Sequence, residues 1–406
     1  MLQMILGAVL IAATILLWLP TVSEALCLLV RFFRPPAMVP STAAVPRLLF
    51  IVPAHNEELH IEACVRSLLE MDYSATARRI VVVADNCTDA TARIVRGLGA
   101  ECLERVDAAL PGKPRAIAWT LARFELSHWD ACVIVDADSV VAPEFAQGLA
   151  KLAPLNDIAF QANIGALNEF DGWLTRLGGL LSRCRYEITY PLKQSAGLNC
   201  PIMGNGMGFG TNVLIQHGWR SFSITEDSEL YAIYTAMGLT IRHAAAANLF
   251  AQEERSLEGG VTQRRRWLGG RLRVIRDWGW RILQSPQIGW RQKLDAFVEL
   301  GLASPVIHLI LALTVVVAAL AVLPTPLGSW IGIGAAASLF TLLITTIAAL
   351  VTHPQPWRTI SSFAMLPVYA GWRAVVLLRT LITIRDTTWR RTNRTASPVP
   401  MINPRA

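Results

Sequence analysis

The chain has 406 residues and a formal net charge of +7, and 53% of its residues are hydrophobic while only 17% are charged. Ordinary soluble domains carry roughly 25% charged residues, so this composition indicates segments inserted in a membrane. Arginines stand beside the hydrophobic segments, as at Arg31, Arg34 and residues 264–276. That placement is typical of cytoplasmic membrane flanks and argues against a nucleic-acid-binding protein.

The seven cysteines are scattered and show no paired CxxC spacing. Neither a disulfide framework nor a zinc site is therefore expected, and a reducing compartment fits best.

Residues 1–31 are predicted to form an N-terminal transmembrane anchor, because their apolar run is long enough to cross about 30 Å of hydrocarbon. The alternative is a cleaved signal peptide, since Ser23-Glu24-Ala25 resembles a cleavage site. No Lys or Arg precedes the apolar run, and signal peptides normally begin with one, so the uncleaved anchor is favoured.

Residues 47–268 alternate strand and helix patterns. Short apolar runs at residues 48–52, 80–84 and 132–135 each end in polar residues, and helical patterns cover residues 57–70 and 113–124. This alternation predicts an α/β domain with a mostly parallel sheet covered by helices. Ligands of such sheets lie beyond the carboxyl ends of the strands.

Carboxylates follow these strands at the predicted ligand edge. Asp136 and Asp138 come directly after the third apolar run, two residues apart. Such hard oxygen ligands suit Mg²⁺ or Mn²⁺ shared with a diphosphate, whereas the plain alternative is a solvated turn. Asp85 ends the second run, although it could instead cap a helix, as we expect of Asp89. Pro53, His55, Asn56 and Glu57 follow the first run, so three strand ends together predict a cleft.

Further charged residues stand at predicted helix starts. Lys113 is placed where anions are favoured, although by itself it would be an ordinary surface lysine. Thr225-Glu226-Asp227 opens a helix, and Thr225 also fits a capping role. Downstream, Gln263, Arg266 and Trp267 lie in a basic stretch whose other arginines fit a membrane-surface helix with snorkelling side chains.

The C-terminal part is predicted to meet the membrane repeatedly. Residues 269–297 read as amphipathic interface helices and residues 298–352 as a transmembrane hairpin. Residues 361–384 contain Arg373 and Arg379, which favours an interfacial or re-entrant helix over a further span. Residues 385–406 form a basic tail that is expected in the cytosol together with the α/β domain of a multi-pass inner (plasma) membrane protein.

Taken in order, these motifs resemble the series found in family 2 glycosyltransferases. The set is Pro53-x-His55-Asn56-Glu57, Asp85, Gly112-Lys113, Asp136-x-Asp138, Thr225-Glu226-Asp227 and Gln263-x-x-Arg266-Trp267. That family includes cellulose, hyaluronan and poly-N-acetylglucosamine synthases and ceramide glucosyltransferase. The resemblance extends over essentially the whole chain, including Trp389-x-Arg391, and implies a GT-A nucleotide-sugar domain.

The resemblance also implies roles for these residues. The nucleotide sugar would be bound by Pro53, His55, Glu57, Asp85, Lys113, Asp136 and Arg266. Asp138 would bind Mg²⁺ or Mn²⁺, and Asp227 would be the general base of an inverting reaction. The acceptor would be contacted by Glu226, Gln263, Trp267 and Asn205.

The acceptor is where the sequence departs from the cellulose synthases. Those enzymes carry a Phe-Phe-Cys-Gly-Ser type motif, whereas residues 203–210 here read Met-Gly-Asn-Gly-Met-Gly-Phe-Gly. The leading expectation is transfer from a nucleotide sugar, with UDP as the expected nucleotide, to a growing β-linked surface polysaccharide. The alternative is transfer of one sugar to a membrane lipid. A non-catalytic membrane scaffold is a third class, against which the retained Asp138 and Asp227 argue.

Overall fold

The computed structural model describes residues 2–33, 45–302, 304–323 and 325–382, which form two compact units. Of the described residues, the sheet unit comprises 45–169 and 199–253, and the helical unit comprises 2–33, 170–198 and those between 254 and 382. The predicted tail at residues 385–406 lies outside the described residues. Residues 170–198 and 254–268, which the sequence grouped with the α/β domain, therefore pack within the helical unit.

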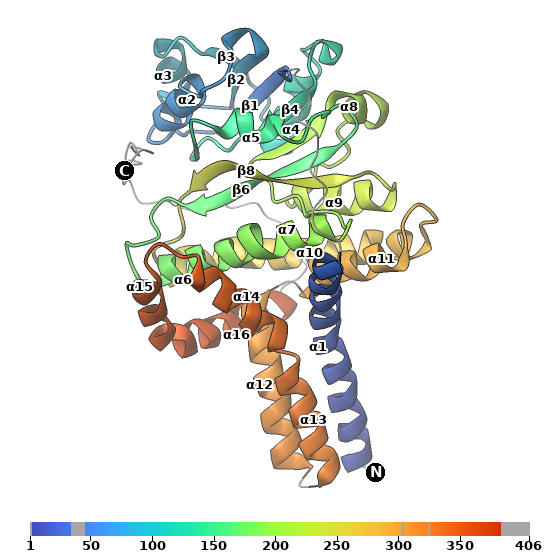
Figure 1. Cartoon of the computed structure of the whole chain (residues 1–406). Helices are drawn as coiled ribbons and strands as arrows, with labels where there is room; N and C mark the ends of the chain where they lie inside the picture. Colours follow the sequence, from blue (N-terminus) through green and yellow to red (C-terminus); the bar gives the residue numbers. More distant parts are fainter. Residues whose placement is uncertain (1, 34–44, 303, 324, 383–406) are drawn as a thin grey trace. The chain divides into compact units, whose positions relative to one another are not determined.

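The sheet unit is an eight-stranded sheet with short helices and turns between its strands (Figure 1). Its strands are β1 (Leu48–Ala54), β2 (Arg78–Asp85), β3 (Glu101–Arg105), β4 (Ala131–Ile134), β5 (Val140–Val141), β6 (Ala159–Ala166), β7 (Met207–Gly210) and β8 (Ile241–Ala251). Its helices are α2 (Ile61–Leu69), η1 (Ala75–Ala77), α3 (Thr91–Gly97), α4 (Lys113–Leu121), η2 (Leu126–His128), α5 (Phe145–Ala150), α8 (Thr211–His217) and α9 (Glu226–Ala236).

The strand order is β3-β2-β1-β4-β7-β6-β8-β5, and the first four strands are mutually parallel. β7 is antiparallel to both β4 and β6, whereas β6 and β8 are again parallel. The α/β class with a mostly parallel sheet, predicted from the sequence, is confirmed. The interior of β1 is fully buried, as expected for a strand that is covered on both faces.

β7 lies where the neighbouring strand β6 leaves little room for a side chain. A Cβ atom at Gly208 would lie 2.0 Å from Cε2 of the Phe160 ring on the neighbouring β6. Glycine is therefore needed for β7 to pack beside that ring. The sequence pattern does not predict this strand. Three positions within the strand or next to it are glycines, and glycine weakens a strand signal.

A buried ion pair lies at the carboxyl edge of the sheet. Arg105 Nη1 lies 2.5 Å from Asp85 Oδ1, and both side chains are about 95% buried, with exposed fractions of 4% and 5%. The other carboxylate oxygen of Asp85 accepts the Gly112 N–H at 3.1 Å. Asp85 thus fixes the residue that precedes α4, so the pair determines where that helix begins.

The helical unit consists entirely of helices. They are α1 (Leu2–Phe33), α6 (Trp173–Arg183), the π-helical turn η3 (Cys184–Thr189), α7 (Tyr190–Ser195), α10 (Leu257–Gln284), α11 (Trp290–Phe297), the π-helical turn η4 (Val298–Leu302), α12 (Pro305–Val322), α13 (Pro326–Ala337), α14 (Phe340–Val351), α15 (Pro356–Ile360), η5 (Ser361–Met365) and α16 (Leu366–Ile382).

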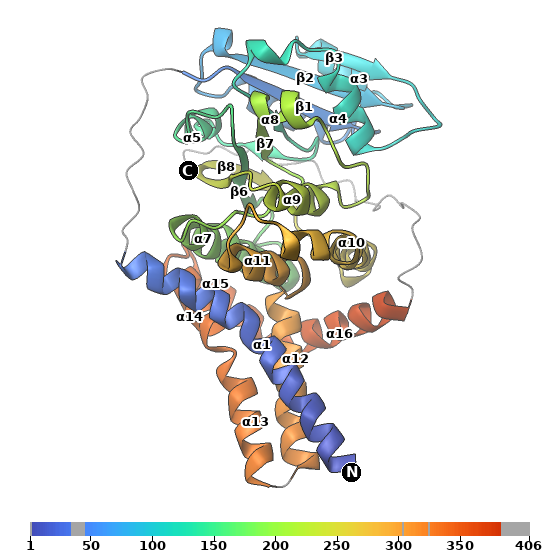
Figure 2. The same ribbon diagram turned by 90° about the vertical axis from the view of Figure 1, so that its right-hand side faces the viewer.

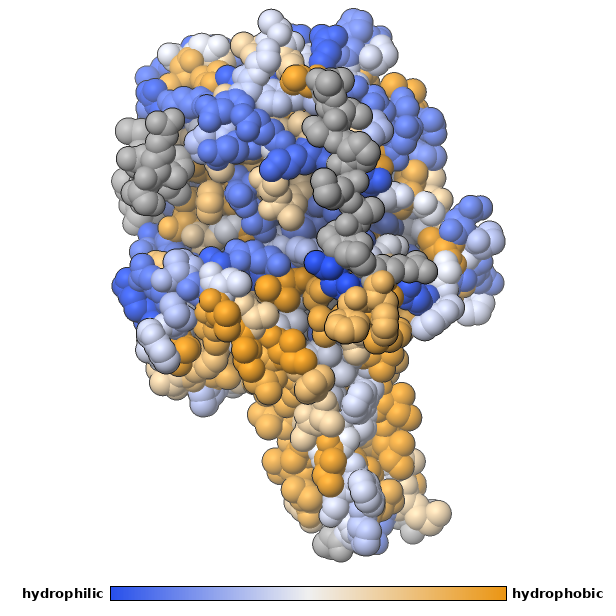
Figure 3. All heavy atoms as spheres, in the orientation of Figure 1, coloured by the Kyte–Doolittle hydropathy of each residue, from blue (hydrophilic) through white to orange (hydrophobic). Residues whose placement is uncertain are grey.

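Four helical stretches in the described residues are long and apolar enough to cross a membrane: Gln3–Phe33, Pro305–Val322, Pro326–Val351 and Pro356–Thr380. α1 packs beside α12 and α13, and these three helices run together in Figure 2. Hydrophobic residues make up most of this part of the surface in Figure 3. Large apolar side chains of these helices, such as Val317 and Trp330, are exposed. Whether the fourth stretch crosses the bilayer or lies at its interface stays a prediction.

The helical unit also buries a cluster of charges. Lys193 of α7 lies 2.9 Å from Asp295 of α11 and 2.8 Å from Glu299 of η4. Ser23 of α1 donates a hydrogen bond to Asp295 at 2.9 Å. Because removing one member would leave an uncompensated buried charge, the cluster links these elements strongly.

The Asp85–Arg105 pair generates the first prediction. Arg105→Met should destabilise the protein by about 3–5 kcal/mol, because it leaves the Asp85 carboxylate buried without its counter-charge. For a unit of this size the midpoint of thermal unfolding should fall by roughly 6–20 °C, measured on the full chain in detergent.

The matched control is Arg66→Met, which removes an exposed ion pair with Glu62 on α2. It should cost below about 1 kcal/mol, because water already solvates both partners. Equal losses in the two variants would show that the Asp85 carboxylate does not depend on Arg105.

Candidate functional site

The polar residues predicted to form a cleft do gather at one edge of the sheet. β1, β2 and β4 are parallel neighbours, so the residues that follow them emerge side by side. His55, after β1, is hydrogen-bonded through Nδ1 to the Asp85 carbonyl at 2.7 Å. Asp85 itself is buried, with its two oxygens bound to Arg105 and Gly112. Its structural contacts are thus clear, whereas its contact with a nucleotide stays a prediction.

The loop after β1 is anchored on the loop after β2. Asn56 adopts a left-handed conformation with φ of 55°, and its Oδ1 accepts the Thr88 N–H at 2.7 Å. The Glu57 N–H donates to Thr91 Oγ1 at 2.8 Å, and the Glu57 carboxylate lies 3.4 Å from His60 Nδ1. Pro53 precedes this loop at the end of β1, where it is half-buried. The predicted nucleotide-binding residues of this motif therefore occupy a well-fixed loop.

Asp89 supports the neighbouring helix start, as predicted. Its Oδ1 accepts hydrogen bonds from the N–H and the hydroxyl of Thr91, at 2.9 and 2.6 Å.

Lys113 lies at the centre of the candidate site. Its Nζ donates to Asp136 Oδ1 and to the Gly204 carbonyl, both at 2.6 Å, and lies 3.7 Å from Glu226 Oε1. Burial works to lower the pKa of Lys113, but Asp136, Glu226 and Asp227 outweigh it and hold the pKa above its ordinary value. The ammonium group is therefore charged, and it joins β4, the loop before β7 and the start of α9.

The Asp136–Asp138 loop is held in place by Asn205. The Asn205 side chain accepts the Asp136 N–H at 3.1 Å and donates to Ser139 Oγ at 2.8 Å. The Asn205 side chain is only 7% exposed, so it supports the Asp136–Asp138 loop from the protein interior. The structure therefore gives Asn205 a positioning contact with the carboxylate loop, while its predicted contact with the acceptor stays a prediction.

Glu226 and Asp227 open α9 beside Lys113. A Cβ atom at Gly204 would lie 3.3 Å from Asp227 Oδ2 and 3.7 Å from Lys113 Nζ, so Asp227 and Lys113 flank the same glycine. Glu226 is buried, and this burial raises its pKa to about 7, with Lys113 lowering it and Asp227 raising it further. The Thr225 side chain makes no capping bond to the helix, whereas Asp227 accepts the Ser228 N–H at 2.6 Å.

The oxygen donors of this loop fit a cation shared with a phosphate ligand. Among the described residues, no group of three or more His, Cys, Asp or Glu side chains could hold a metal ion by itself. Mg²⁺ is usually bound by one or two carboxylates together with substrate phosphates, so a complete protein cage is not required. Asp138, half-buried and one residue before the buried Ser139, supplies such a carboxylate.

Gln263, Arg266 and Trp267 belong to α10 of the helical unit and are described with it. Trp267 is 37% exposed, and the guanidinium of Arg264 lies 4.9 Å from its ring centroid. Nε of Arg266 is buried without a hydrogen-bond partner in the described part of the chain. The roles predicted for these residues toward donor and acceptor stay predictions.

Two supporting residues were missed by the sequence reasoning. Gln161 is fully buried in β6, where its side chain accepts the Met203 N–H at 2.8 Å and donates to the Asn205 carbonyl at 2.7 Å. Arg105 fixes Asp85 as described above. For Gln161 a signal existed, because an amide inside the apolar run Ala159-Phe160-Gln161-Ala162 must find buried partners.

Comparison with known proteins gives a family match and relatives. Residues 46–270 match the model of the family described as "Glycosyltransferase like family 2". A beta-monoglucosyldiacylglycerol synthase of Synechocystis sp. is 28% identical over 63% of this chain and 54% of its own length. The "Probable glycosyltransferase YdaM" of Bacillus subtilis is 26% identical over 57% of this chain and 56% of its own length. The chain thus spans about half the length of these curated relatives.

The fold is shared with a solved structure over nearly the whole chain. The mannosyltransferase PcManGT from Pyrobaculum calidifontis, solved in complex with GDP-Man and Mn²⁺, matches with a TM-score of 0.55 at 18% identity. The match covers 94% of this chain and 96% of that one. At this identity the likeness shows a common GT-A-like architecture and no more.

The raised pKa of Glu226 generates the second prediction. The folded chain holds this proton more tightly than the unfolded chain, whose carboxyl has the ordinary pKa of 4.5. The contribution to stability is therefore fully present below pH 4.5 and lost as the pH rises to about 7. The loss should be on the order of 3 kcal/mol and should be absent in Glu226→Gln. Thermal unfolding midpoints measured from pH 5 to 8 test this.

Glu144→Gln, which changes an exposed carboxyl of the same unit, is the control and should follow the wild-type pH curve. Parallel curves for the wild type and Glu226→Gln would contradict the raised pKa.

Proposed function

Because residues 46–270 match its model, the chain belongs to glycosyltransferase family 2, and we propose that it transfers one sugar from a nucleotide sugar to a hydroxyl group of a membrane lipid. The observation that carries this proposal is the group of Lys113, Asp136, Glu226 and Asp227 around Gly204 at the ligand edge of the sheet. It combines a cation for a diphosphate with carboxylates suited to metal binding and to proton transfer.

A lipid acceptor has better support than the polysaccharide acceptor favoured by the sequence motifs. A curated relative is named as a synthase of a glucosyl diacylglycerol, which is a membrane lipid. The chain itself carries four helical stretches that are long and apolar enough for a bilayer. The resemblance to family 2 enzymes is confirmed for the family as a whole, and the choice among its members rests on the acceptor.

Proton transfer is assigned to Asp227. As the acceptor hydroxyl oxygen bonds to the anomeric carbon, the bond from that carbon to the diphosphate oxygen breaks, and the hydroxyl proton passes to the Asp227 carboxylate. Attack opposite the leaving group inverts the configuration. Asp227 is half-buried at the start of α9, and its Oδ1 is oriented by the Ser228 N–H. The side chain is thus held in place while it remains accessible.

The donor end is assigned to Lys113 and the carboxylate loop. Lys113 would face the diphosphate and offset its negative charge, and the loops after β1 and β2, with Glu57 and Asp85, would contact the nucleoside. Asp138, with Asp136 beside it, would hold Mg²⁺ or Mn²⁺, which when bound supplies positive charge to the leaving group. UDP is the nucleotide we expect.

The residues on α10 complete the proposal. Arg266 would approach the leaving group, whereas Gln263 and Trp267 would contact the acceptor, together with Glu226 and Asn205. The unpartnered Arg266 Nε fits this, since a buried guanidinium donor is costly to leave unpaired. We place the sheet unit in the cytosol, because the basic residues cluster beside the apolar segments.

The third prediction is that the purified full chain forms a glycolipid. Incubation in detergent with radiolabelled UDP-sugars and diacylglycerol should yield label that moves with lipid in thin-layer chromatography. Label in material that stays at the origin and is degraded by a glycanase would instead identify a polysaccharide product. Absence of label in both fractions with every donor tested would count against transfer itself.

The fourth prediction concerns Asp227→Asn. Turnover should fall by roughly a hundredfold or more, because the acceptor hydroxyl loses its proton acceptor. Nucleotide-sugar binding, measured by calorimetry, should change little, since the substitution preserves the size of the side chain.

Asp157→Asn is the matched control, because Asp157 is an exposed aspartate of the same unit that is bonded to Asn212. It should retain full turnover. Normal turnover in Asp227→Asn would place the base elsewhere.

A further inference from the structure

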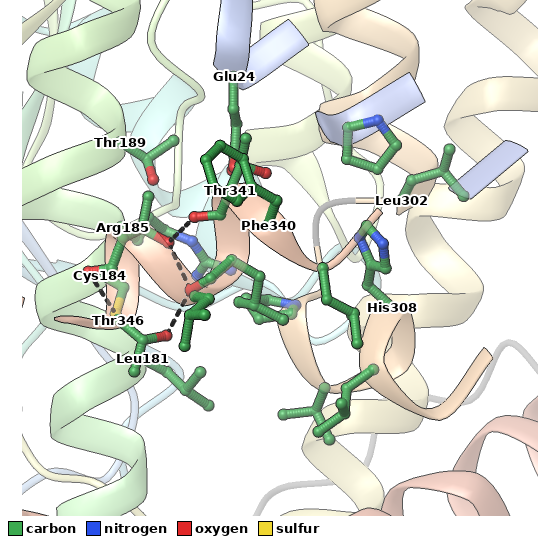
Figure 4. A pocket seen from close by; sticks show the side chains of 18 of the residues that line it. Glu24, Leu181, Cys184, Arg185, Thr189, Leu302, His308, Phe340, Thr341 and Thr346 are labelled. Carbon is green, nitrogen blue, oxygen red and sulfur yellow. Dashed lines mark hydrogen bonds between the residues drawn. The ribbon is translucent and has the colours of Figure 1, made fainter. Parts of the chain in front are cut away.

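The helical unit contains an open cavity of about 590 Å³. Its walls come from α1, α6, η3, α7, α11, η4, α12, α13, α14, η5 and α16, so it lies among the helices that meet the membrane-spanning stretches. Figure 4 shows Glu24, Arg185, Thr341 and His308 placed around it from different helices. Pockets of about 300–1,000 Å³ with mainly apolar walls and a few polar groups are typical of small-molecule sites.

Most of the cavity wall is apolar. Leu177, Leu181, Val306, Leu309 and Leu342 are among the lining residues. Water gains few hydrogen bonds in such a space, whereas a hydrocarbon chain loses none and gains contacts. The chemistry of this wall therefore fits an acyl chain.

One part of the lining is polar, and positive and negative side chains within it neutralise one another. Lys193 lines the cavity with its ammonium bound to both Asp295 and Glu299. Glu24 and Arg185 also line it. The Lys193 cation thus has two carboxylate partners already, so it offers little to an additional anion.

Glu299 supplies a hydrogen-bond acceptor at this polar end. Its Oε2 is 2.8 Å from Lys193, while its Oε1 is buried and accepts no hydrogen bond from the described residues. The side chain is only 6% exposed, and it lines the cavity. A buried carboxylate oxygen without a donor is costly, and a hydroxyl group would satisfy it, whereas a phosphate brings only further negative charge.

From these observations we infer that the cavity holds, before transfer, an uncharged, hydroxyl-bearing glycerolipid of the diacylglycerol class. Its acyl chain lies against the apolar wall and its hydroxyl donates to Glu299, which this hydroxyl must leave before Asp227 can accept its proton. The inference rests on the proposed function. It narrows the class of acceptor from membrane lipids in general to uncharged membrane lipids. Lipid phosphates, including polyprenyl phosphates, are disfavoured because the lining carries three carboxyl groups, Glu24, Asp295 and Glu299, against the two cations Lys193 and Arg185, and Lys193 is bound to two of them.

The test uses the purified full chain in detergent without any nucleotide sugar. A diacylglycerol with a diazirine in one acyl chain is irradiated, and the labelled peptides are identified by mass spectrometry. Label should appear within residues 336–346, which line the cavity. Unlabelled diacylglycerol should compete at a concentration about tenfold or more below that of phosphatidic acid with the same chains, a difference of roughly 1.4 kcal/mol.

Two matched variants locate the site. Ala336 lines the cavity on α13, whereas Ala321 is an exposed alanine of α12 that does not. Ala336→Phe should reduce labelling at least about fivefold, because the ring occupies the space of the chain, while Ala321→Phe should label like the wild type. Both variants should unfold at the wild-type midpoint temperature, which shows that the fold is intact, and Ala321→Phe should also hydrolyse the nucleotide sugar at the wild-type rate.

The outcomes distinguish a failure of the lipid-binding inference from a failure of the proposed function. Labelling that is lost in Ala336→Phe and outcompeted by diacylglycerol supports the inference even if no sugar transfer to lipid is found, in which case the proposed function alone fails. Equal labelling in both variants, label confined to peptides without a cavity-lining residue, or stronger competition by phosphatidic acid or a polyprenyl phosphate overturns the inference, whatever the transfer assay shows.

Discussion

One ammonium group among three carboxyl groups is the constraint on which the candidate site depends. Lys113 is bonded to Asp136 and lies near Glu226 and Asp227, so the negative groups outnumber the positive one. Burial and, to a smaller extent, the neighbouring Asp227 raise the pKa of Glu226 to about 7. A bound divalent cation would relieve this imbalance, and a diphosphate could then follow. Asp85 and Asn205 matter because they hold the two sides of this arrangement, namely the start of α4 and the loop after β4.

The sequence was informative wherever a local pattern decides the structure. Strands such as β1 and β2 are β-rich apolar runs, and parallel pairing then places the residues that follow them at one edge. β7 could not be foreseen, because its glycine at position 208 has a reason only once the Phe160 ring lies beside it. The partners of Arg105 and Gln161 were hidden for the same reason, since they come from distant parts of the chain.

The two ends of the proposed reaction differ in chemistry as well as in location. The residues that we propose to bind the donor are charged and lie close together, which suits a nucleoside diphosphate. The helical unit instead offers a mainly apolar cavity, in which Lys193 is bound to two carboxylates and Glu299 Oε1 has no hydrogen-bond donor among the described residues. Motifs identify the first kind of site well, because its residue types stand in short patterns that can be read directly in the sequence. The second kind depends on how helices pack, which explains why the acceptor was the weakest part of the sequence prediction.

The position of residues 170–198 in the chain has a consequence for biogenesis. α6 is synthesised between two parts of the sheet unit, yet its Leu177 packs against Val306 and Tyr369, which leave the ribosome much later. The nascent chain must therefore keep an apolar helix face covered while the rest of the sheet unit is still being synthesised. The surface of the membrane is the natural temporary cover, since an amphipathic helix can rest there. Synthesis at the bilayer would thus protect this segment from aggregation before its partners exist.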